Sequence, residues 1–172
     1  MLVLQTDRLQ LRQLTLDDAA FMLRLLNEPS WLRYIGDRNV HTLEEARQYL
    51  LNGPLDSYAR LGFGFYLVAD KATGTTVGMC GLAQRDYLDD PDIGYALLPE
   101  HSGQGYVQEA AQAVLAYARD MLHLPRLLAT VRPDNAASIK VLDKLGMQLA
   151  RRFYREADQR ELLLYAIELH RD

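Results

Sequence analysis

The fold is decided by the stretch DIGYALLPEHSGQGYVQEA, which spans residues 92–110. Its first part is typical of a strand that ends near Leu98, and a long helix begins at Tyr106. Between them, Gly103 and Gly105 allow a tight turn and leave backbone amides free. At a helix N-terminus, such amides and the positive end of the dipole favour an anion such as a pyrophosphate. Taken alone, the loop is explained equally well as a phosphate site or as a simple turn.

This loop differs from two well-known nucleotide-binding loops. A dinucleotide-binding loop requires a third glycine three residues after Gly105, where Gln108 stands. A P-loop requires Gly-Lys-Ser or Gly-Lys-Thr, and neither occurs here. The order of elements differs too, since hairpin-linked strands precede the loop in place of alternating strands and helices. Both nucleotide-binding folds are therefore disfavoured.

Downstream of the loop, the pattern predicts two helices and three strands. Apolar residues at helical spacing indicate a helix over 106–122, and a second helix runs from about Asn135 to Leu145 with Gly146 as its stop. Short apolar runs predict strands over 127–131, 148–154 and 161–169.

Upstream, the pattern predicts a strand and two helices followed by a hairpin. The strand covers residues 8–14, and Thr15 caps a helix that ends near Asn27 and Pro29. Thr42 and Glu45 form a capping box for a second helix, which Gly53 and Pro54 close. The β-rich runs from Phe63 and from Thr75 flank the turn 71–74, so two antiparallel strands are expected there.

Composition limits the class of protein. The chain has 172 residues, a net charge of −4 and dispersed Lys and Arg, which argues for one domain and against a nucleic-acid partner. Its single cysteine, Cys80, permits no disulfide framework, which fits a cytoplasmic location. No signal peptide and no membrane span is predicted. The four histidines lack ligand spacing, so no metal site is expected.

An ordered series of motifs resembles one known family. It runs from DIGYALLPE through SGQGYVQEA to VRPDNAASIKVLDKLGM, is preceded by TDRLQLRQLTLDDA, RYIGDRNVHTLEEARQYL and TTVGMCGL, and closes with LLLYAIEL. The series is similar to the GNAT superfamily of acetyl-CoA-dependent N-acetyltransferases, in the branch of the ribosomal-protein acetyltransferases RimJ and RimL. The likeness covers nearly the whole chain, and several motifs in order are more specific than one glycine loop.

The resemblance implies a single GNAT domain over residues 1–172. Its fold class is α+β, a three-layer arrangement in which a mixed, mostly antiparallel, twisted sheet splays at its fourth strand and carries helices on both faces. In the family, a bulge in that strand opens a cleft for the pantetheine arm. Leu98 breaks the alternation of Ile93, Tyr95 and Leu97 as a bulge residue would, although a fully buried strand end explains it equally well.

The resemblance also implies acetyl-CoA as co-substrate. Backbone groups of Leu97 and Leu98 would bind the pantetheine. The pyrophosphate would lie on the amides of the loop residues Ser102, Gly103, Gln104, Gly105, Tyr106 and Val107. The family usually has Gln or Arg where Ser102 stands, and Gly or Ala where Val107 stands, so the loop departs from the pattern at both ends.

Catalytic candidates follow from the same resemblance. Asn135 and Ser138 lie beside the cofactor in the family, and Ser138 is the leading candidate to protonate the CoA thiolate, with Tyr154 or Tyr165 as substitutes. Asn135 could also simply cap a helix. The acceptor amine requires a base or a desolvated pocket, because only the neutral amine attacks a thioester. Glu109, Asp92 and Glu161 are candidates, and none is preferred.

The acceptor side is the least specified. Trp31, Tyr34, Tyr58 and Asp92 are candidate acceptor contacts, although the aromatic residues are explained better as core of a helix pair. The acceptor is a small-molecule amine or a peptide amine such as a protein N-terminus. Family members are often dimers, so a homodimer is one assembly that the resemblance implies. The alternative to an enzyme is a non-catalytic CoA sensor, which needs no proton donor.

Overall fold

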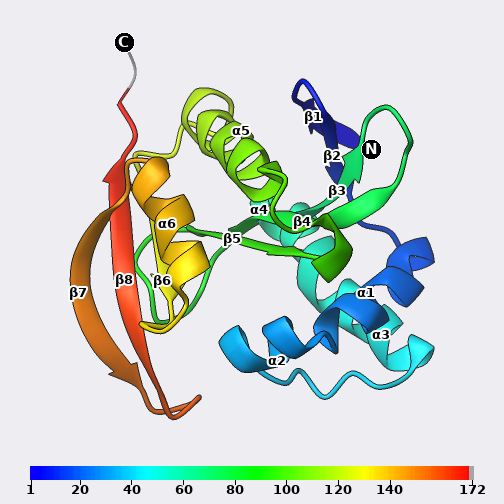
Figure 1. Ribbon diagram of the computed structural model, residues 1–172, viewed down its shortest axis with the longest axis horizontal. Coiled ribbons are helices and arrows are strands. Elements are labelled where there is room, and N and C mark those ends of the chain that lie inside the picture. Colours follow the sequence, from blue (N-terminus) through cyan, green and yellow to red (C-terminus); the bar gives the residue numbers. More distant parts are fainter. Residues whose placement is uncertain (171–172) are drawn as a thin grey trace.

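The computed structural model describes residues 1–170 as an eight-stranded sheet in the order β1-β2-β3-β4-β5-β6-β8-β7 (Figure 1). Neighbouring strands are antiparallel except β5 and β6, which are parallel. The predicted mixed, mostly antiparallel sheet is therefore confirmed. The strands are β1 (Leu2–Gln5), β2 (Leu9–Gln13), β3 (Phe65–Asp70), β4 (Thr76–Ala83), β5 (Asp92–Leu97), β6 (Arg126–Val131), β7 (Gln148–Arg155) and β8 (Arg160–Glu168).

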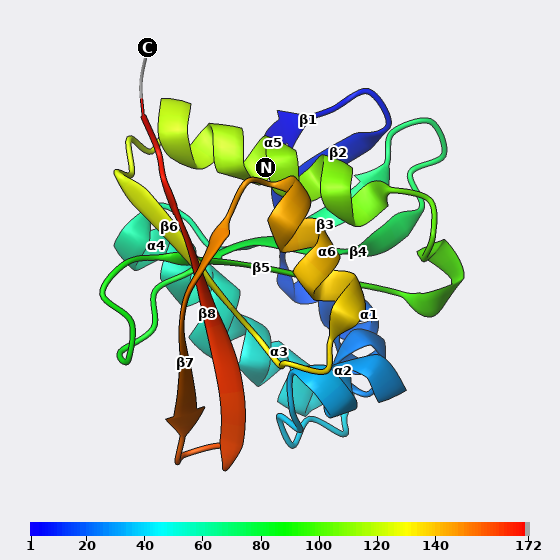
Figure 2. The same cartoon turned by 60° about the vertical axis from the view of Figure 1, so that its left-hand side comes forward.

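Helices cover both faces of the sheet (Figures 1 and 2). One face packs against α5 and α6 around a large core, and the other packs against α1, α2 and α3 around a second core. The helices are η1 (Leu16–Asp18), α1 (Ala19–Leu26), α2 (Pro29–Tyr34), α3 (Leu43–Leu50), η2 (Leu51–Leu55), α4 (Asp56–Leu61), η3 (Pro99–His101), α5 (Tyr106–Asp120) and α6 (Ala136–Lys144). Thr15 and Thr42 cap their helices as predicted.

Two short elements, β1 and α2, were not predicted from the sequence. The strand β1 is a half-exposed edge strand with little apolar contrast between its faces. The helix α2 begins at Pro29, which the sequence pattern assigned to the end of the preceding helix. Proline is equally suited to the first position of a helix, since its missing N–H would have no partner there. Pro29 therefore belongs to the start of α2, and α1 already ends at Leu26.

The predicted end of the second helix at Gly53 and Pro54 is wrong. The chain continues from α3 through the π-helical turn η2 directly into α4, with Pro54 buried inside that turn. A π-turn shifts the hydrogen-bond ladder, which helps to accommodate a residue without an N–H. The helical segment ends at Gly62, whose φ of 78° is the left-handed conformation typical of a helix stop.

The sheet splays between β5 and β6, but without the predicted bulge. The two strands pair only at Asp92 and Leu128, whereas β5 stays in unbroken register with β4 from Asp92 to Leu97. Leu97 contacts the first core and Leu98 is buried in the second, which is ordinary alternation continued past the strand end. Two consecutive apolar residues are explained because helices cover both faces of β5.

Candidate active site

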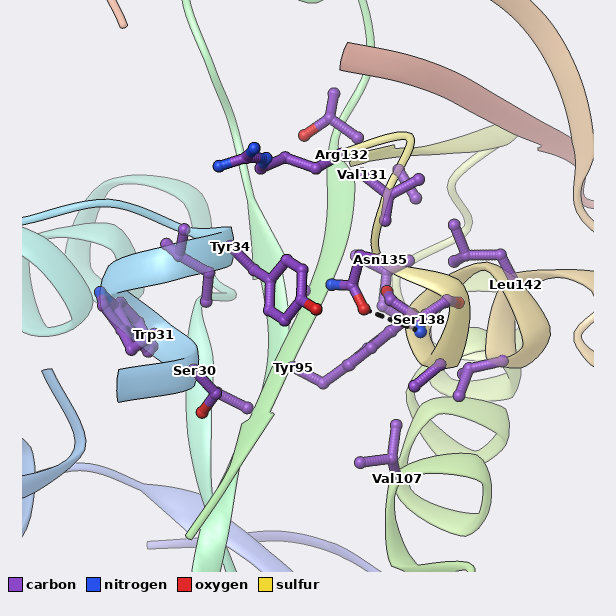
Figure 3. Close-up of a pocket in the computed structure, with 18 of the residues that line it drawn as sticks. Ser30, Trp31, Tyr34, Tyr95, Val107, Val131, Arg132, Asn135, Ser138 and Leu142 are labelled. Atoms are coloured by element: carbon purple, nitrogen blue, oxygen red, sulfur yellow. Dashed lines mark hydrogen bonds between the residues drawn. The ribbon is translucent and has the colours of Figure 1, made fainter. Parts of the chain in front are cut away.

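A cavity of about 750 Å³ lies where β5 and β6 separate (Figure 3). Its walls come from β5, the loop before α5, the start of α6, the helix α2 and the β7–β8 hairpin. Eleven of the predicted site residues line it: Trp31, Tyr34, Asp92, Leu97, Ser102, Gly103, Gly105, Tyr106, Val107, Asn135 and Ser138. The remaining seven candidates do not line it: Tyr58, Leu98, Gln104, Glu109, Tyr154, Glu161 and Tyr165.

The free edge of β5 supplies backbone groups to this cavity. The amide of Leu98 donates to the carbonyl of Val77 in β4 at 2.9 Å. Backbone groups alternate between the two edges of a strand, so those of Tyr95 and Leu97 point away from β4, toward the gap beside β6. The Leu98 amide is therefore not available to the cavity. The sequence interpretation named Leu97 and Leu98, whereas the structure directs the backbone groups of Tyr95 and Leu97 toward the gap.

The loop before α5 presents its backbone to the other end of the cavity. Gly103 and Gly105 adopt φ values of 77° and 78°, which only glycine adopts without strain. Gly105 is the N-cap of α5, and within the described residues no side chain accepts a hydrogen bond from the first-turn amides. These amides and the helix dipole form an electropositive end of the cavity. Gln104 instead turns its carbonyl to Arg8, whose Nη1 donates to it at 2.9 Å.

Two hydroxyl groups meet in the middle of the cavity (Figure 3). Tyr95 Oη lies 2.8 Å from Ser138 Oγ, and it also contacts the carbonyl of Ser138 at 3.2 Å. Asn135 accepts a hydrogen bond from the Ser138 amide at 3.2 Å, which confirms its role as the helix cap. Burial raises the pKa of Tyr95 to about 12, and the hydrogen bond with Ser138 opposes that rise. Both hydroxyls therefore stay protonated at neutral pH.

Asp92 lies at the point where β5 and β6 pair, and it is almost fully buried. Burial raises its pKa to about 6, although Arg85 opposes the rise through an Nε to Oδ1 contact of 3.2 Å. A carboxylate with a pKa near neutrality can take up and release protons under physiological conditions. Neither Arg85 nor the hydroxyl of Tyr95 was singled out from the sequence. The alternation of Ile93, Tyr95 and Leu97 was the signal that Tyr95 faces the gap.

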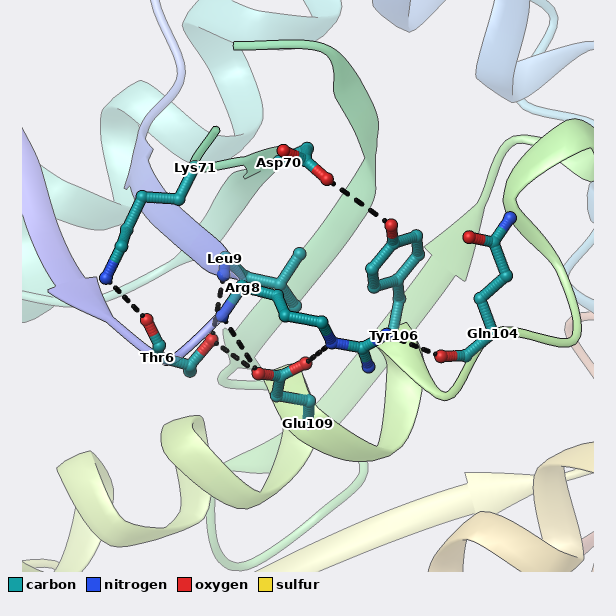
Figure 4. A network of polar contacts seen from close by, with 8 residues as sticks. All are labelled: Thr6, Arg8, Leu9, Asp70, Lys71, Gln104, Tyr106 and Glu109. Carbon is teal, nitrogen blue, oxygen red and sulfur yellow. Dashed lines mark hydrogen bonds and ion pairs between the residues drawn. The ribbon is translucent and has the colours of Figure 1, made fainter. Parts of the chain in front are cut away.

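Glu109 lies on the side of α5 that faces β1 and β2, away from the cavity (Figure 4). Arg8 Nε donates to its Oε2 at 2.7 Å, and Thr6 Oγ1 and the Arg8 amide donate to its Oε1. Partial burial would raise the pKa of Glu109, but these hydrogen bonds hold it below its usual value. The carboxylate thus ties the β1–β2 hairpin to α5, which does not fit a base for the amine.

Two aromatic candidates also lie outside the cavity. Tyr154 is 59% exposed on the edge strand β7. Tyr58 accepts a hydrogen bond from the Leu14 amide, donates to the Phe65 carbonyl and stacks on Tyr66. A strand pattern fixes which residues share a face, but the splay of the sheet decides which faces line the cleft. Sequence alone could not supply that splay.

The aromatic residues of α2 line the acceptor side. Tyr34 extends from α2 toward Asn135 and Tyr95 in Figure 3, while Trp31 lies farther back. Trp31 is only 5% exposed and belongs to the second core, so the core interpretation holds for it as well. Its Nε1 is buried without a hydrogen-bond partner in the part of the chain that the structure describes.

Residues 1–170 contain neither a bilayer-crossing helix nor a cluster of metal ligands. None of the helices in this range is long and apolar enough to cross a bilayer. No group of three or more His, Cys, Asp or Glu side chains with the arrangement of a metal site occurs in the same range.

Comparison with known proteins gives consistent matches. The model of the acetyltransferase (GNAT) domain matches residues 8–148. The uncharacterized protein YkkB of Bacillus subtilis (strain 168) is 31% identical over 151 residues, 86% of each chain. The uncharacterized N-acetyltransferase YoaA of the same organism is 32% identical, over 85% of this chain and 82% of that protein. The structure of RimL, a ribosomal L7/L12 alpha-N-protein acetyltransferase in complex with coenzyme A, superposes with a TM-score of 0.83 over 98% of both chains at 21% identity, a likeness of fold.

Proposed function

This chain belongs to the GNAT family of acetyltransferases, and we propose that it transfers the acetyl group of acetyl-CoA directly to a primary amine. The observation that carries the proposal is the cavity between β5 and β6, which joins uncapped helix amides at one end to the Tyr95–Ser138 hydroxyl pair in its middle. An elongated substrate with a phosphate group at one end and a thioester at the other fits this arrangement.

In this proposal the chain binds acetyl-CoA mainly through its backbone. The amides of Gly103, Gly105 and Val107 would donate to the pyrophosphate, since no side chain among residues 1–170 accepts a hydrogen bond from the first turn of α5. The N–H and C=O groups of Tyr95 and Leu97 would pair with the pantetheine amides, as a neighbouring strand would. Asn135 would hold Ser138 in place through its bond to the Ser138 amide.

The proposed reaction removes two protons from the ammonium group of the acceptor and places one on the CoA sulfur. The amine nitrogen attacks the thioester carbonyl carbon, the carbon–sulfur bond breaks, and the CoA thiolate takes a proton from Ser138. Tyr95, 2.8 Å from Ser138 Oγ, would replace that proton, and the second proton, which the nitrogen loses as it becomes an amide, would return to Tyr95 through water. Asp92 would accept the proton that the ammonium group of the acceptor loses, directly or through water, because its pKa near 6 leaves it ionised at neutral pH.

The proposed acceptor is a peptide or small-molecule amine that enters past α2, between Tyr34 and the β7–β8 hairpin. The fold is shared with RimL, which is named for acting on the α-amino group of a ribosomal protein. That similarity supports a peptide N-terminus as one acceptor class to test.

The test measures thiol release from acetyl-CoA in the presence of N-terminal peptides, amino acids, polyamines and aminoglycosides, with CoA binding followed by calorimetry. Amine-dependent release with formation of the acetylated amine is the expected result. Tight CoA binding without release in the presence of any amine would contradict the proposal and favour a CoA sensor.

A further inference from the structure

Four arginines line the end of the cavity that lies farthest from the α5 N-terminus. They are Arg38 after α2, Arg132 at the end of β6, and Arg155 and Arg160 at the β7–β8 turn, and we refer to them as the arginine cluster. In Figure 3, Arg132 and Val107 of the α5 N-terminus lie at opposite ends of the cavity, with Tyr95 and Ser138 between them. The cluster concentrates positive charge in one place, although the whole chain carries a net charge of −4.

The cluster is held in place by the end of α2. Arg132 Nη1 donates to the carbonyl of Arg33 at 2.7 Å, and Arg160 Nη1 donates to the carbonyl of Tyr34 at 3.1 Å. Each contact uses one N–H of a guanidinium group, at Nη1. They also fix the orientation of both groups without neutralising their charge, because a carbonyl carries no net charge.

Nearby carboxylates neutralise only part of the positive charge of the arginine cluster. Asp158 pairs with Arg155 and lies 3.5 Å from Arg160, and Asp134 pairs with Arg132 at 3.2 Å. Asp134 is shared with Arg33 outside the cavity, at 3.7 Å. Arg38 is exposed and forms no ion pair within the described residues. The cavity end therefore keeps an excess of positive charge.

Arg160 shows the effect of this excess most clearly. Its Nε is buried and lacks a hydrogen-bond partner among residues 1–170. Burial lowers the pKa of its guanidinium group, Asp158 opposes this, and the positive charges of Arg132 and Arg38 lower it further. A buried donor without a partner costs free energy, and a bound anion would remove that cost.

We propose that the arginine cluster binds a carboxylate of the acceptor, so that the preferred acceptors are amines with a carboxylate close to the amino group. Free amino acids and peptides with an acidic N-terminal sequence have this chemistry. This inference rests on the proposed acetyl transfer to an amine. Polyamines and basic peptides are poor acceptors in this scheme, because the cluster repels them.

The position of Tyr34 connects the cluster to the reacting groups. Its carbonyl accepts from Arg160, while its side chain extends toward Asn135 and Tyr95 (Figure 3). Tyr34 therefore links the cluster to the part of the cavity that holds the hydroxyl pair. In this proposal an amino acid or the first residues of a peptide reach from the cluster to that pair.

The test compares kcat/KM for acceptors matched in everything but charge. The pairs are a free amino acid against its carboxamide, an N-terminal Ser-Glu-Asp peptide against Ser-Gln-Asn and Ser-Lys-Lys, and phosphoethanolamine against ethanolamine. Acceptors with a carboxylate should be preferred by about tenfold or more, the effect of one well-placed charged hydrogen bond. Turnover of the neutral or basic acceptors equal to that of the carboxylate acceptors, or a preference for the phosphate alone, would overturn the proposal.

Two variants test whether the preference for carboxylate acceptors comes from the arginine cluster. Arg38→Gln removes an exposed charge without an ion pair within residues 1–170, and Arg160→Gln tests the partly buried member, whose Nε is buried. Both should reduce the carboxylate preference toward parity and leave CoA binding unchanged. Arg47→Gln on α3 is the matched control, because Arg47 is exposed and lines neither end of the cavity. An unchanged preference in both cluster variants would contradict the assignment.

A binding measurement separates this inference from the proposed reaction. Trp31 is the only tryptophan and lines the cavity, so its fluorescence reports acceptor binding without turnover. In CoA-saturated protein, the acidic peptide should bind about tenfold more tightly than the neutral one. Equal affinity, or no binding of either peptide, would overturn the inference even if acetyl transfer occurs. Absence of thiol release with a retained acidic preference would overturn only the proposed reaction.

Discussion

Ser138 and Tyr95 form a pair in which each hydroxyl lies within hydrogen-bonding distance of the other. Ser138→Ala removes the hydroxyl that we assign to the thiolate and leaves the helix cap by Asn135 intact. We expect kcat to fall by about 10- to 100-fold, at the low end for general acid catalysis because a thiolate is a good leaving group. The calorimetric Kd of CoA should stay nearly the same.

Tyr95→Phe is the companion variant for this measurement. It keeps the aromatic ring on β5 and removes only the second hydroxyl, so its effect on kcat should be smaller than that of Ser138→Ala. A Ser138→Ala rate equal to that of the parent would remove the serine from the reaction. A larger effect of Tyr95→Phe would transfer the donor role to the tyrosine.

Asp92 gives a prediction of pH dependence. Its pKa of about 6 means that the base is ionised above pH 6 and protonated below it. We expect kcat/KM to fall as the pH decreases through about 6, and Asp92→Asn should remove this limb and lower the rate at neutral pH. Rates measured from about pH 5 to about pH 9 with one acceptor test it.

Glu161→Gln is the control for the pH profile. Glu161 lies on β8, pairs with Arg152 at 3.0 Å and does not line the cavity. Its replacement should leave the profile unchanged. A parent profile without a limb near pH 6 would show that Asp92 does not act as the base, and that its pairing with Arg85 is structural.

At the level of elements, the loop before α5 can be tested with two equivalent glycines. Gly103 and Gly74 have φ values of 77° and 75°, and a Cβ added at either position would meet no atom within 4 Å. Gly103→Ala and Gly74→Ala should both lower the free energy of unfolding by about 1 kcal/mol, the strain of a left-handed residue. Only Gly103→Ala should weaken CoA binding, by about tenfold.

Thermal unfolding and calorimetry on both variants measure the two effects separately. Gly74 lies in the β3–β4 turn, remote from the cavity, so it controls for strain alone. Equal CoA affinity in the two variants would contradict a role for the loop in phosphate binding.

The sequence predicted those elements that carry a strong apolar period. The long helix α5, the β3–β4 hairpin and the α6 helix with its Asn135 cap are confirmed. The edge strand β1 and the helix α2 were not predicted, because neither has a wide apolar face. The π-helical turn at Pro54 could not be predicted either, since proline ends most helices.

Many of the residues that line the cavity could be predicted from the sequence, but the direction of individual side chains and backbone groups could not, and the roles of these residues stay predictions. The glycines of the loop follow from their conformational freedom. Glu109 is one turn from that loop, yet it faces β1 and β2, because the helix phase relative to the sheet is set by packing. The arginine cluster joins residues from three distant segments, and no local pattern reveals such a meeting.

At the level of the whole molecule, the β5–β6 seam is the point where ligand binding should change backbone protection. The Leu98 amide already bonds to Val77, whereas the Leu97 amide faces the gap. CoA should slow hydrogen exchange at Leu97 by a large factor and leave Leu98 nearly unaffected. Amide-resolved exchange by NMR, with and without CoA, tests this, and equal slowing at both residues would contradict the alternation.

The strand order also has a consequence for synthesis of the protein on the ribosome. The first five strands neighbour one another in the order in which they are made, so they can pair as the chain emerges. In contrast, β7 pairs only with β8, and β6 pairs with β5 at a single position. The strands β6 and β7 therefore complete their pairing only with β8, and the β6 wall of the cleft becomes part of the full sheet only when the last strand has left the exit tunnel.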